Sequence, residues 1–145
     1  MKILAVKEFK FCCAHRLYKH ESKCRNLHGH NYKLRIYAEG DKKDSVGRVI
    51  DFAVLKDRVG GWIDSNWDHA TLYGSEDKEM RGMLNVYPNH KQYMMPENPT
   101  AESMAEYILT HVCPEAFNGC GVVVNKVQLW ETDSSFVEVS RGSKD

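Results

Sequence analysis

Two histidines separated by one residue are the first feature of this sequence that could do chemistry. His28 and His30 lie in a stretch that alternates like a β-strand, so both imidazoles should project from one face. Neutral imidazole is a common ligand of zinc and other transition metals. A metal site is therefore one interpretation of this pair. The other is an incidental pair of histidines that satisfy ordinary hydrogen bonds.

A third histidine favours the metal interpretation. The strand-like stretch 2–14 carries Phe9, Phe11 and Cys13 on one face, and the next residue on that face is His15. If the two stretches pair, all three imidazoles come close together. Three protein ligands leave one tetrahedral position open for water or substrate, which is the pattern of a catalytic zinc site. We predict Zn²⁺ bound by the three histidines: His15, His28 and His30.

Cys24 precedes His28 by four residues and lies between Lys23 and Arg25. Positive neighbours favour the reactive thiolate, which makes Cys24 a candidate base or nucleophile. The alternative is a small buried apolar side chain, the commoner role of a free cysteine. For the strand and helix cysteines we favour this structural role: Cys12, Cys13 and Cys113.

Three acidic or basic positions elsewhere could also take part. Asp68 directly precedes His69 and could orient or charge its imidazole, although this dipeptide alone is a weak signal. Glu131 shares a strand face with Val127 and Leu129, where a carboxylate is costly to bury without a partner. It could accept hydrogen bonds from a ligand with adjacent N–H groups, or form an ordinary salt bridge.

The pattern of apolar residues predicts the elements that would position these groups. Phe52, Leu55 and Val59 follow Asp51 at helical spacing, and a second helix should begin after Thr100 as its N-cap. The stretch 74–97 is polar and rich in Met, and we expect a long loop with one short helix. Strands at both ends with helices between them favour an α+β domain, with helices on one face of an antiparallel sheet. The predicted strands are residues 2–14, 29–39, 122–132 and 136–141.

Composition limits the classes of function. The 145 residues suit one domain, 1–145, and 20 Lys and Arg balance 20 Asp and Glu, so bulk charge gives no indication of nucleic-acid binding. No stretch resembles a membrane span, since the apolar start is interrupted at Lys7. Five cysteines, an odd number without Cys-x-x-Cys spacing, indicate reduced thiols and a cytoplasmic protein.

Taken together, the motifs resemble the superfamily of 6-pyruvoyl-tetrahydropterin synthase and 6-carboxytetrahydropterin synthase. The similarity extends over residues 9–142 with order and spacing preserved. Jointly the motifs are highly specific, although the Asp-His pair alone would not be. They are Ala14-His15-Arg16-Leu17, Cys24-x-x-x-His28-Gly29-His30-Asn31-Tyr32, Asp68-His69-Ala70-Thr71-Leu72, Asn98-Pro99-Thr100-Ala101-Glu102 and Glu131-Thr132.

The resemblance implies a tunnelling fold (T-fold): a four-stranded antiparallel sheet with two helices on one face, whose subunits join into a barrel, commonly as hexamers. It implies that the three histidines bind zinc and that Glu131 anchors a pterin ring. It also implies that Cys24 transfers protons together with Asp68 and His69 from a neighbouring subunit. Such assembly would cover sheet edges that a monomer leaves exposed.

The spacing of three residues between Cys24 and His28 resembles the bacterial 6-carboxytetrahydropterin synthases of queuosine and deazaguanine biosynthesis. The implied reaction converts 7,8-dihydroneopterin triphosphate to 6-carboxytetrahydropterin with loss of acetaldehyde and triphosphate. Candidates to hold the triphosphate are Arg16, Lys19 and Lys23. The alternatives are the pyruvoyl synthase reaction and a non-catalytic pterin- or zinc-binding module.

The sequence departs from the family pattern in three places. Cys12-Cys13 replace the usual small Ser or Ala residues, and Tyr73 stands where Asn is frequent. The stretch 74–97 is longer than in compact bacterial members. The last two differences could change the shape of the pocket and hence the product.

Overall fold

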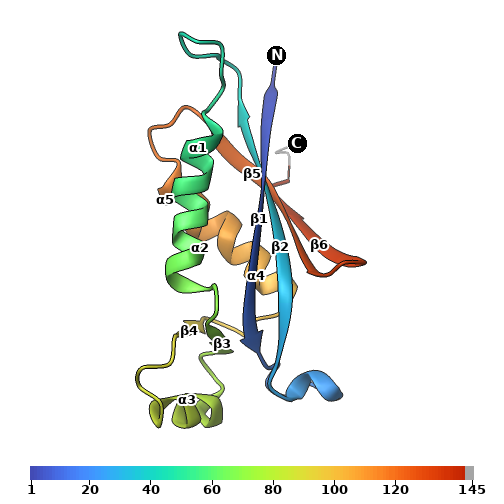
Figure 1. Ribbon diagram of the computed structural model, residues 1–145. Helices are drawn as coiled ribbons and strands as arrows, with labels where there is room; N and C mark the ends of the chain where they lie inside the picture. Colours follow the sequence, from blue (N-terminus) through green and yellow to red (C-terminus); the bar gives the residue numbers. More distant parts are fainter. Residues whose placement is uncertain (143–145) are drawn as a thin grey trace.

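The computed structural model describes residues 1–142 and contains one six-stranded sheet with the strand order β4-β3-β1-β2-β5-β6. Its centre is the long antiparallel hairpin of β1 and β2, and β5 and β6 extend it on one side (Figure 1). The strands are β1 (Ile3–His15), β2 (His28–Gly40), β3 (Thr71–Gly74), β4 (Gln92–Met95), β5 (Val123–Thr132) and β6 (Ser135–Ser140).

Strict alternation in β1 and β2 makes one face of the sheet apolar. Phe9 pairs with Leu34 and Phe11 pairs with Tyr32, and all four side chains are buried. The intervening residues, such as Lys10, face the opposite side. Both strands begin and end within one residue of the predicted ranges, as expected for long segments with a clear period of two.

Two helical segments cover this apolar face (Figure 1). Each begins at a side-chain cap: the Asp51 carboxylate accepts the N–H of Ala53, and the Thr100 hydroxyl accepts the N–H of Ser103. Both caps were predicted, and both satisfy backbone donors that a helix start leaves free. The first segment comprises α1 (Phe52–Leu55), a π-helical turn (Lys56–Gly60) and α2 (Gly61–Asn66). The second comprises α4 (Ala101–Tyr107), a π-helical turn (Ile108–Val112) and α5 (Cys113–Ala116).

Gly60 lies inside the first segment although glycine disfavours helix interiors. Its Cα faces the ring of Phe9 in β1, and an added Cβ would approach that ring to 3.2 Å. Glycine therefore allows the helix to pack closely on the sheet at this point.

The prediction of a four-stranded antiparallel sheet is wrong. Two further strands add in parallel to the β1 edge: β3, which ends where the stretch expected to be a loop begins, and β4, which lies within that stretch. Between them lies α3 (Lys78–Asn85), the short helix that was expected. Each added strand has four residues, too few to show a recognisable alternation. All of β3 is buried, as is typical of strands covered on both faces.

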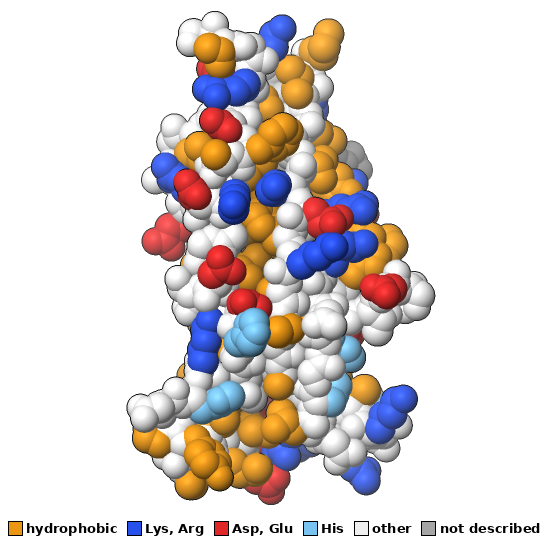
Figure 2. All heavy atoms as spheres, in the orientation of Figure 1, with side chains coloured by type: hydrophobic (Ala, Val, Ile, Leu, Met, Phe, Trp, Pro, Cys, Tyr) orange, Lys and Arg blue, Asp and Glu red, His pale blue; other side chains and the backbone are white. Residues whose placement is uncertain are grey.

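The α3 region forms one end of the molecule, away from the chain termini (Figure 1). Hydrophobic side chains gather on the surface there (Figure 2), among them the exposed Met83, Val86 and Tyr87. All five cysteines are free, so the expectation of unpaired thiols is confirmed. Among residues 1–142, no helix combines the length and apolar character needed to cross a membrane.

Candidate functional site

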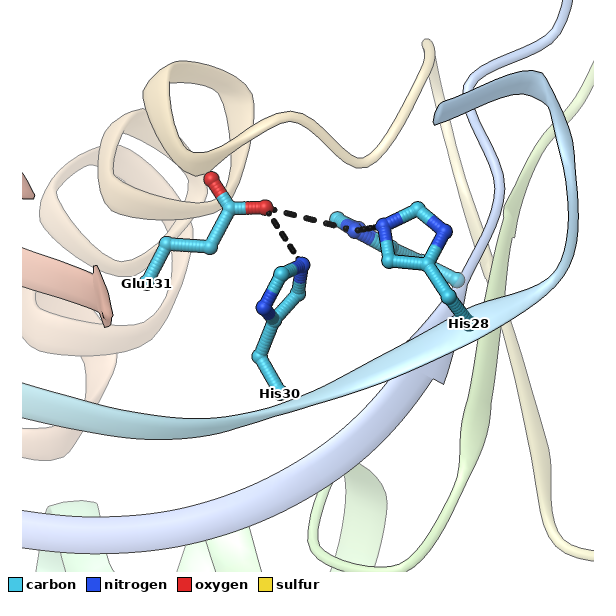
Figure 3. Close-up of side chains that lie close together, drawn as sticks. His28, His30 and Glu131 are labelled. Carbon is cyan, nitrogen blue, oxygen red and sulfur yellow. Dashed lines mark hydrogen bonds and ion pairs between the residues drawn. The ribbon is translucent and has the colours of Figure 1, made fainter. Parts of the chain in front are cut away.

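The three predicted metal ligands converge at one end of the central hairpin. The strand register pairs His15 with His28 and Cys13 with His30, which places all three imidazoles on the same sheet face. Ring centroids are 4.6 Å apart for His15 and His28, 4.9 Å for His28 and His30, and 5.2 Å for His15 and His30. Figure 3 shows His28 and His30 extending from β2 toward the space that Glu131 enters from β5.

Backbone carbonyls fix the orientation of two rings. His15 Nδ1 lies 2.7 Å from the carbonyl oxygen of Pro99, and His28 Nδ1 lies 2.7 Å from that of Asn26. A carbonyl only accepts, so each Nδ1 donates and each Nε2 keeps its lone pair in the neutral ring. These two Nε2 atoms are 3.1 Å apart. Two facing lone pairs repel each other, and a cation between them removes that repulsion.

The third imidazole has an unsatisfied nitrogen aimed at the same space. His30 Nε2 lies 2.9 Å from Glu131 Oε1 but is not aligned for a hydrogen bond, so this buried atom has no hydrogen-bond partner. Burial lowers the pKa of His30, which favours the neutral, metal-binding form. Where the imidazoles are protonated instead, a hydrogen bond from His15 Nε2–H, 3.4 Å from Glu131, and the positive charge of the rings lower the pKa of Glu131.

The donor set therefore fits a divalent metal ion. Ligand atoms of four residues lie within 4.8 Å of one another: His15, His28, His30 and Glu131. Three imidazole nitrogens and a carboxylate oxygen are the ligand types of zinc and similar borderline ions. Each of the two carbonyl-bound rings also has the second hydrogen bond that ordinarily orients a histidine ligand.

Asn98 and Pro99 explain why a motif remote in sequence belongs to this site. The Pro99 carbonyl orients His15, and the Asn98 side chain forms two hydrogen bonds with the Tyr18 backbone, at 2.9 and 2.8 Å. These bonds hold the connection between β1 and β2. Within it, the Leu17 N–H donates to the Cys24 carbonyl at 2.9 Å. Cys24 lies on a 3₁₀ turn (Lys23–Arg25) and is partly exposed, so it is not a buried apolar residue.

The predicted pair Asp68 and His69 lies elsewhere. Asp68 Oδ2 contacts His69 Nδ1 at 2.9 Å, and Asp68 Oδ1 accepts the backbone N–H of Cys12 at 3.0 Å. The Cys12 side chain projects from the sheet face opposite His15, because the two are three positions apart on one strand. Within one chain, the Asp68–His69 pair is not part of the group of four metal-ligand candidates. Cys24 belongs neither to that group nor to the group formed by Asp68, His69 and Cys12.

The three predicted basic residues have different surroundings. Arg16 is committed to a salt bridge: its Nε lies 2.6 Å from Asp77 and its Nη1 lies 2.9 Å from Glu79. Asp77 is buried and was not predicted as a partner of Arg16, although an Asp at a helix start is a recognisable cap. Lys19 and Lys23 are exposed, and within residues 1–142 neither forms a salt bridge.

Residues 5–142 match the protein family described as 6-pyruvoyl tetrahydropterin synthase. The chain belongs to this family. The resemblance predicted from the motifs is thereby confirmed, and the match spans both the histidine group and the Asp68–His69 pair.

Curated relatives within the 6-pyruvoyl tetrahydropterin synthase family carry a more specific name. The chain is 39% identical over 137 residues to the 6-carboxy-5,6,7,8-tetrahydropterin synthase of Rickettsia felis, covering 94% of this chain and 99% of the relative. The protein of the same name from Haemophilus influenzae is 35% identical, covering 91% of this chain and 94% of the relative.

Solved structures share the fold of this family member. An uncharacterized protein from Wolinella succinogenes superimposes with a TM-score of 0.81 at 23% identity, covering 98% of this chain and 99% of that one. The 6-pyruvoyl tetrahydropterin synthase of Plasmodium vivax gives a TM-score of 0.72 at 21% identity, covering 99% of both chains.

Proposed function

We propose that this chain is a zinc-dependent 6-carboxy-5,6,7,8-tetrahydropterin synthase. It would convert 7,8-dihydroneopterin triphosphate to 6-carboxytetrahydropterin, releasing acetaldehyde and triphosphate, in queuosine and 7-deazaguanine biosynthesis. The observation that carries the proposal is the convergence of three imidazoles, two with their Nε2 lone pairs facing each other. Relatives that are 35–39% identical and bear this enzyme's name support the choice of reaction.

His15, His28 and His30 are the proposed zinc ligands. Bound zinc supplies Lewis acidity, which stabilises negative charge developing on a substrate oxygen. The nearby Glu131 is proposed to bind the pterin, because its ionised carboxylate accepts hydrogen bonds from adjacent N–H groups. Glu131 lies 2.9 Å from His30, and this proximity supports the proposal that the pterin binds next to the metal.

Cys24, Asp68 and His69 are the proposed proton-transfer residues. Cys24 as a thiolate would take a proton from the substrate side chain, and His69 would return a proton. Burial raises the pKa of Asp68, but hydrogen bonds from the Cys12 backbone N–H and from His69 outweigh it, so the pKa is lowered. An ionised Asp68 can orient and charge the imidazole 2.9 Å away.

We further propose that active sites are shared between subunits of a T-fold hexamer. The four metal-ligand candidates and the Asp68–His69 pair lie in two separate groups, with the Cys12 and His15 side chains on opposite faces of β1, and this separation supports the proposal. The exposed Lys19 and Lys23, which form no salt bridge within residues 1–142, are the proposed triphosphate contacts. Arg16 is left out of this set because carboxylates already neutralise it. Five free thiols support a cytoplasmic location.

A product assay tests the proposed reaction. Zinc-loaded protein is incubated with 7,8-dihydroneopterin triphosphate, and the products are identified by mass spectrometry. Acetaldehyde together with 6-carboxytetrahydropterin supports the proposal. A 6-pyruvoyl product instead indicates the pyruvoyl synthase reaction. Unchanged substrate in the presence of stoichiometric zinc indicates a non-catalytic pterin- or zinc-binding module.

A further inference from the structure

A second group of metal-ligand types lies outside the histidine site. The Cys12 thiol, a carboxylate oxygen of Asp68 and a ring nitrogen of His69 lie within 4.8 Å of one another. Cys12 belongs to β1, whereas Asp68 and His69 follow α2, so the fold brings together residues 56 positions apart. The sequence alone indicated only a structural role for Cys12. Its thiol is in fact partly exposed beside two polar side chains.

Backbone contacts hold these three residues in place. The Cys12 N–H donates to Asp68 Oδ1 at 3.0 Å, and the His69 N–H donates to the Cys12 carbonyl at 2.6 Å. Lys91 Nζ donates to the Asp68 carbonyl at 2.6 Å. His69 has a positive φ of 63°, which is uncommon for a residue other than glycine. The hydrogen bonds from the His69 N–H to Cys12 and from Lys91 to the Asp68 carbonyl hold the backbone in this conformation. Strained backbone conformations of this kind concentrate at functional sites.

The distances are close to those around a bound ion. Zinc bonds sulfur at about 2.3 Å and nitrogen or oxygen at about 2.0–2.2 Å, so ligand atoms around one tetrahedral ion lie roughly 3.3–3.8 Å apart. Side chains already within 4.8 Å of one another reach this spacing by small rotations. The His69 side chain is 77% exposed, so its ring is free to make such a rotation.

The group is accessible and chemically distinct from the histidine site. Cys12 and His69 line two adjoining surface hollows of about 360 and 600 Å³. Of the two groups, this one alone includes sulfur. Soft and borderline cations such as Cd²⁺ and Zn²⁺ bind thiolate strongly, so they should select this group once the histidine site is filled.

We propose that Cys12, Asp68 and His69 form a second binding site for a thiophilic divalent cation. On binding, the Cys12 thiol releases its proton to solvent, and bonds to the ion replace the Asp68–His69 hydrogen bond. Three protein ligands leave a fourth position for water. One consequence rests on the proposed function: an ion held by Asp68 and His69 would block their proton transfer, so excess metal would inhibit the synthase.

Cadmium binding tests the site without relying on turnover. Zinc-loaded, full-length protein is titrated with Cd²⁺ while the ultraviolet cadmium–thiolate charge-transfer band is recorded. Zinc and cadmium are then counted by elemental analysis after desalting. We expect one additional equivalent of cadmium, with the band present and the original zinc retained. Cys12→Ser should remove both the band and the additional equivalent.

Two further variants make the result specific. His69→Ala keeps the thiol but removes one ligand, and we expect at least about tenfold weaker cadmium binding. Cys120→Ser is the matched control, since Cys120 is also a partly exposed free thiol, and it should bind cadmium like the unaltered protein. A band that survives Cys12→Ser overturns the proposal, as does cadmium that enters only by displacing the original zinc. Either result leaves the proposed synthase activity to its own product assay.

Discussion

His15 Nε2 and His28 Nε2 face each other at 3.1 Å, and a backbone carbonyl holds each ring from its other side. The two nitrogens come from paired positions of β1 and β2, so neither ring can withdraw without breaking a hydrogen bond or the strand pairing. This arrangement orients the lone pairs before any ion arrives. Loss of either imidazole alone should therefore be enough to weaken metal binding strongly.

Replacing one of these imidazoles should release the metal. For His28→Ala we expect zinc affinity to fall about 100-fold or more, because removing a direct ligand costs at least as much as removing its supporting partner. Zinc per chain, measured by elemental analysis after dialysis against a weak chelator, reports the loss. His111→Ala is the control, since His111 is exposed on the second helical segment and stacks on Tyr107. Unchanged zinc in His28→Ala would exclude the proposed metal site.

Glu131 lies close enough to the histidines to act as a fourth ligand, but we propose that it binds the pterin. Glu131→Gln should keep stoichiometric zinc, because three imidazoles remain. It should lower kcat/KM by about 10- to 100-fold, as expected when a charge-assisted hydrogen bond to substrate becomes a neutral one. Parallel measurement of zinc content and steady-state kinetics separates the two roles. Zinc lost together with activity would identify a metal ligand instead.

The salt bridge between Arg16 and Asp77 should anchor α3 to the end of β1. Asp77→Asn should lower the free energy of unfolding by about 3 kcal/mol, because it removes one partner of a buried pair. Burial raises the pKa of Asp77, but the Arg16 hydrogen bonds and the Met80 N–H more than compensate, so the folded-state pKa lies below the unfolded value of about 3.9.

The sign of this shift sets the pH dependence. The stabilisation from Asp77 is complete above about pH 5 and is lost as the pH falls through the lowered pKa. Urea unfolding from pH 7 to pH 3 should therefore show the gap between Asp77→Asn and the unaltered protein closing toward acid. Glu79→Gln is the control: its side chain is 72% exposed, so its contribution should stay within about 1 kcal/mol. A gap that stays constant between pH 5 and pH 3 would contradict the assignment.

The sequence was sufficient to predict those helices and strands whose own residues show a clear periodic pattern or a capping residue. The strands β1 and β2 alternate over thirteen residues each, and Asp51 and Thr100 mark helix starts by side-chain type. The strands β3 and β4 have four residues each, and their hydrogen bonds depend on the β1 edge. No local pattern distinguishes such strands from a loop, because tertiary pairing determines them.

The same distinction applies to the site. Strand parity predicted that His15, His28 and His30 share a face, since the period of two is independent of context. The carbonyls of Asn26 and Pro99 could not be predicted as ring partners, because every residue carries one. The salt bridge of Arg16 could not be predicted for a related reason: its partner Asp77 is 61 positions away, so local charge suggested a free cation.

The opposite placement of His15 and the Asp68–His69 pair leads to a test of shared active sites. If each site combines the histidines and Cys24 of one subunit with Asp68 and His69 of a neighbour, two inactive variants can complement each other. Subunits carrying Cys24→Ala and subunits carrying His69→Ala are mixed in equal amounts, dissociated and reassembled. Random assembly leaves about a quarter of the sites with both halves intact, so about a quarter of the full activity should return.

The control mixture uses two variants altered in the same half. Cys24→Ala mixed with His28→Ala should recover no activity, because every site takes its thiol and its metal ligands from one defective chain. Activity per chain is measured together with the oligomer mass, so failed assembly is recognised directly. Recovery in both mixtures would point to contamination or repair rather than sharing. No recovery in the first mixture, with assembly intact, would mean that each chain completes its own site.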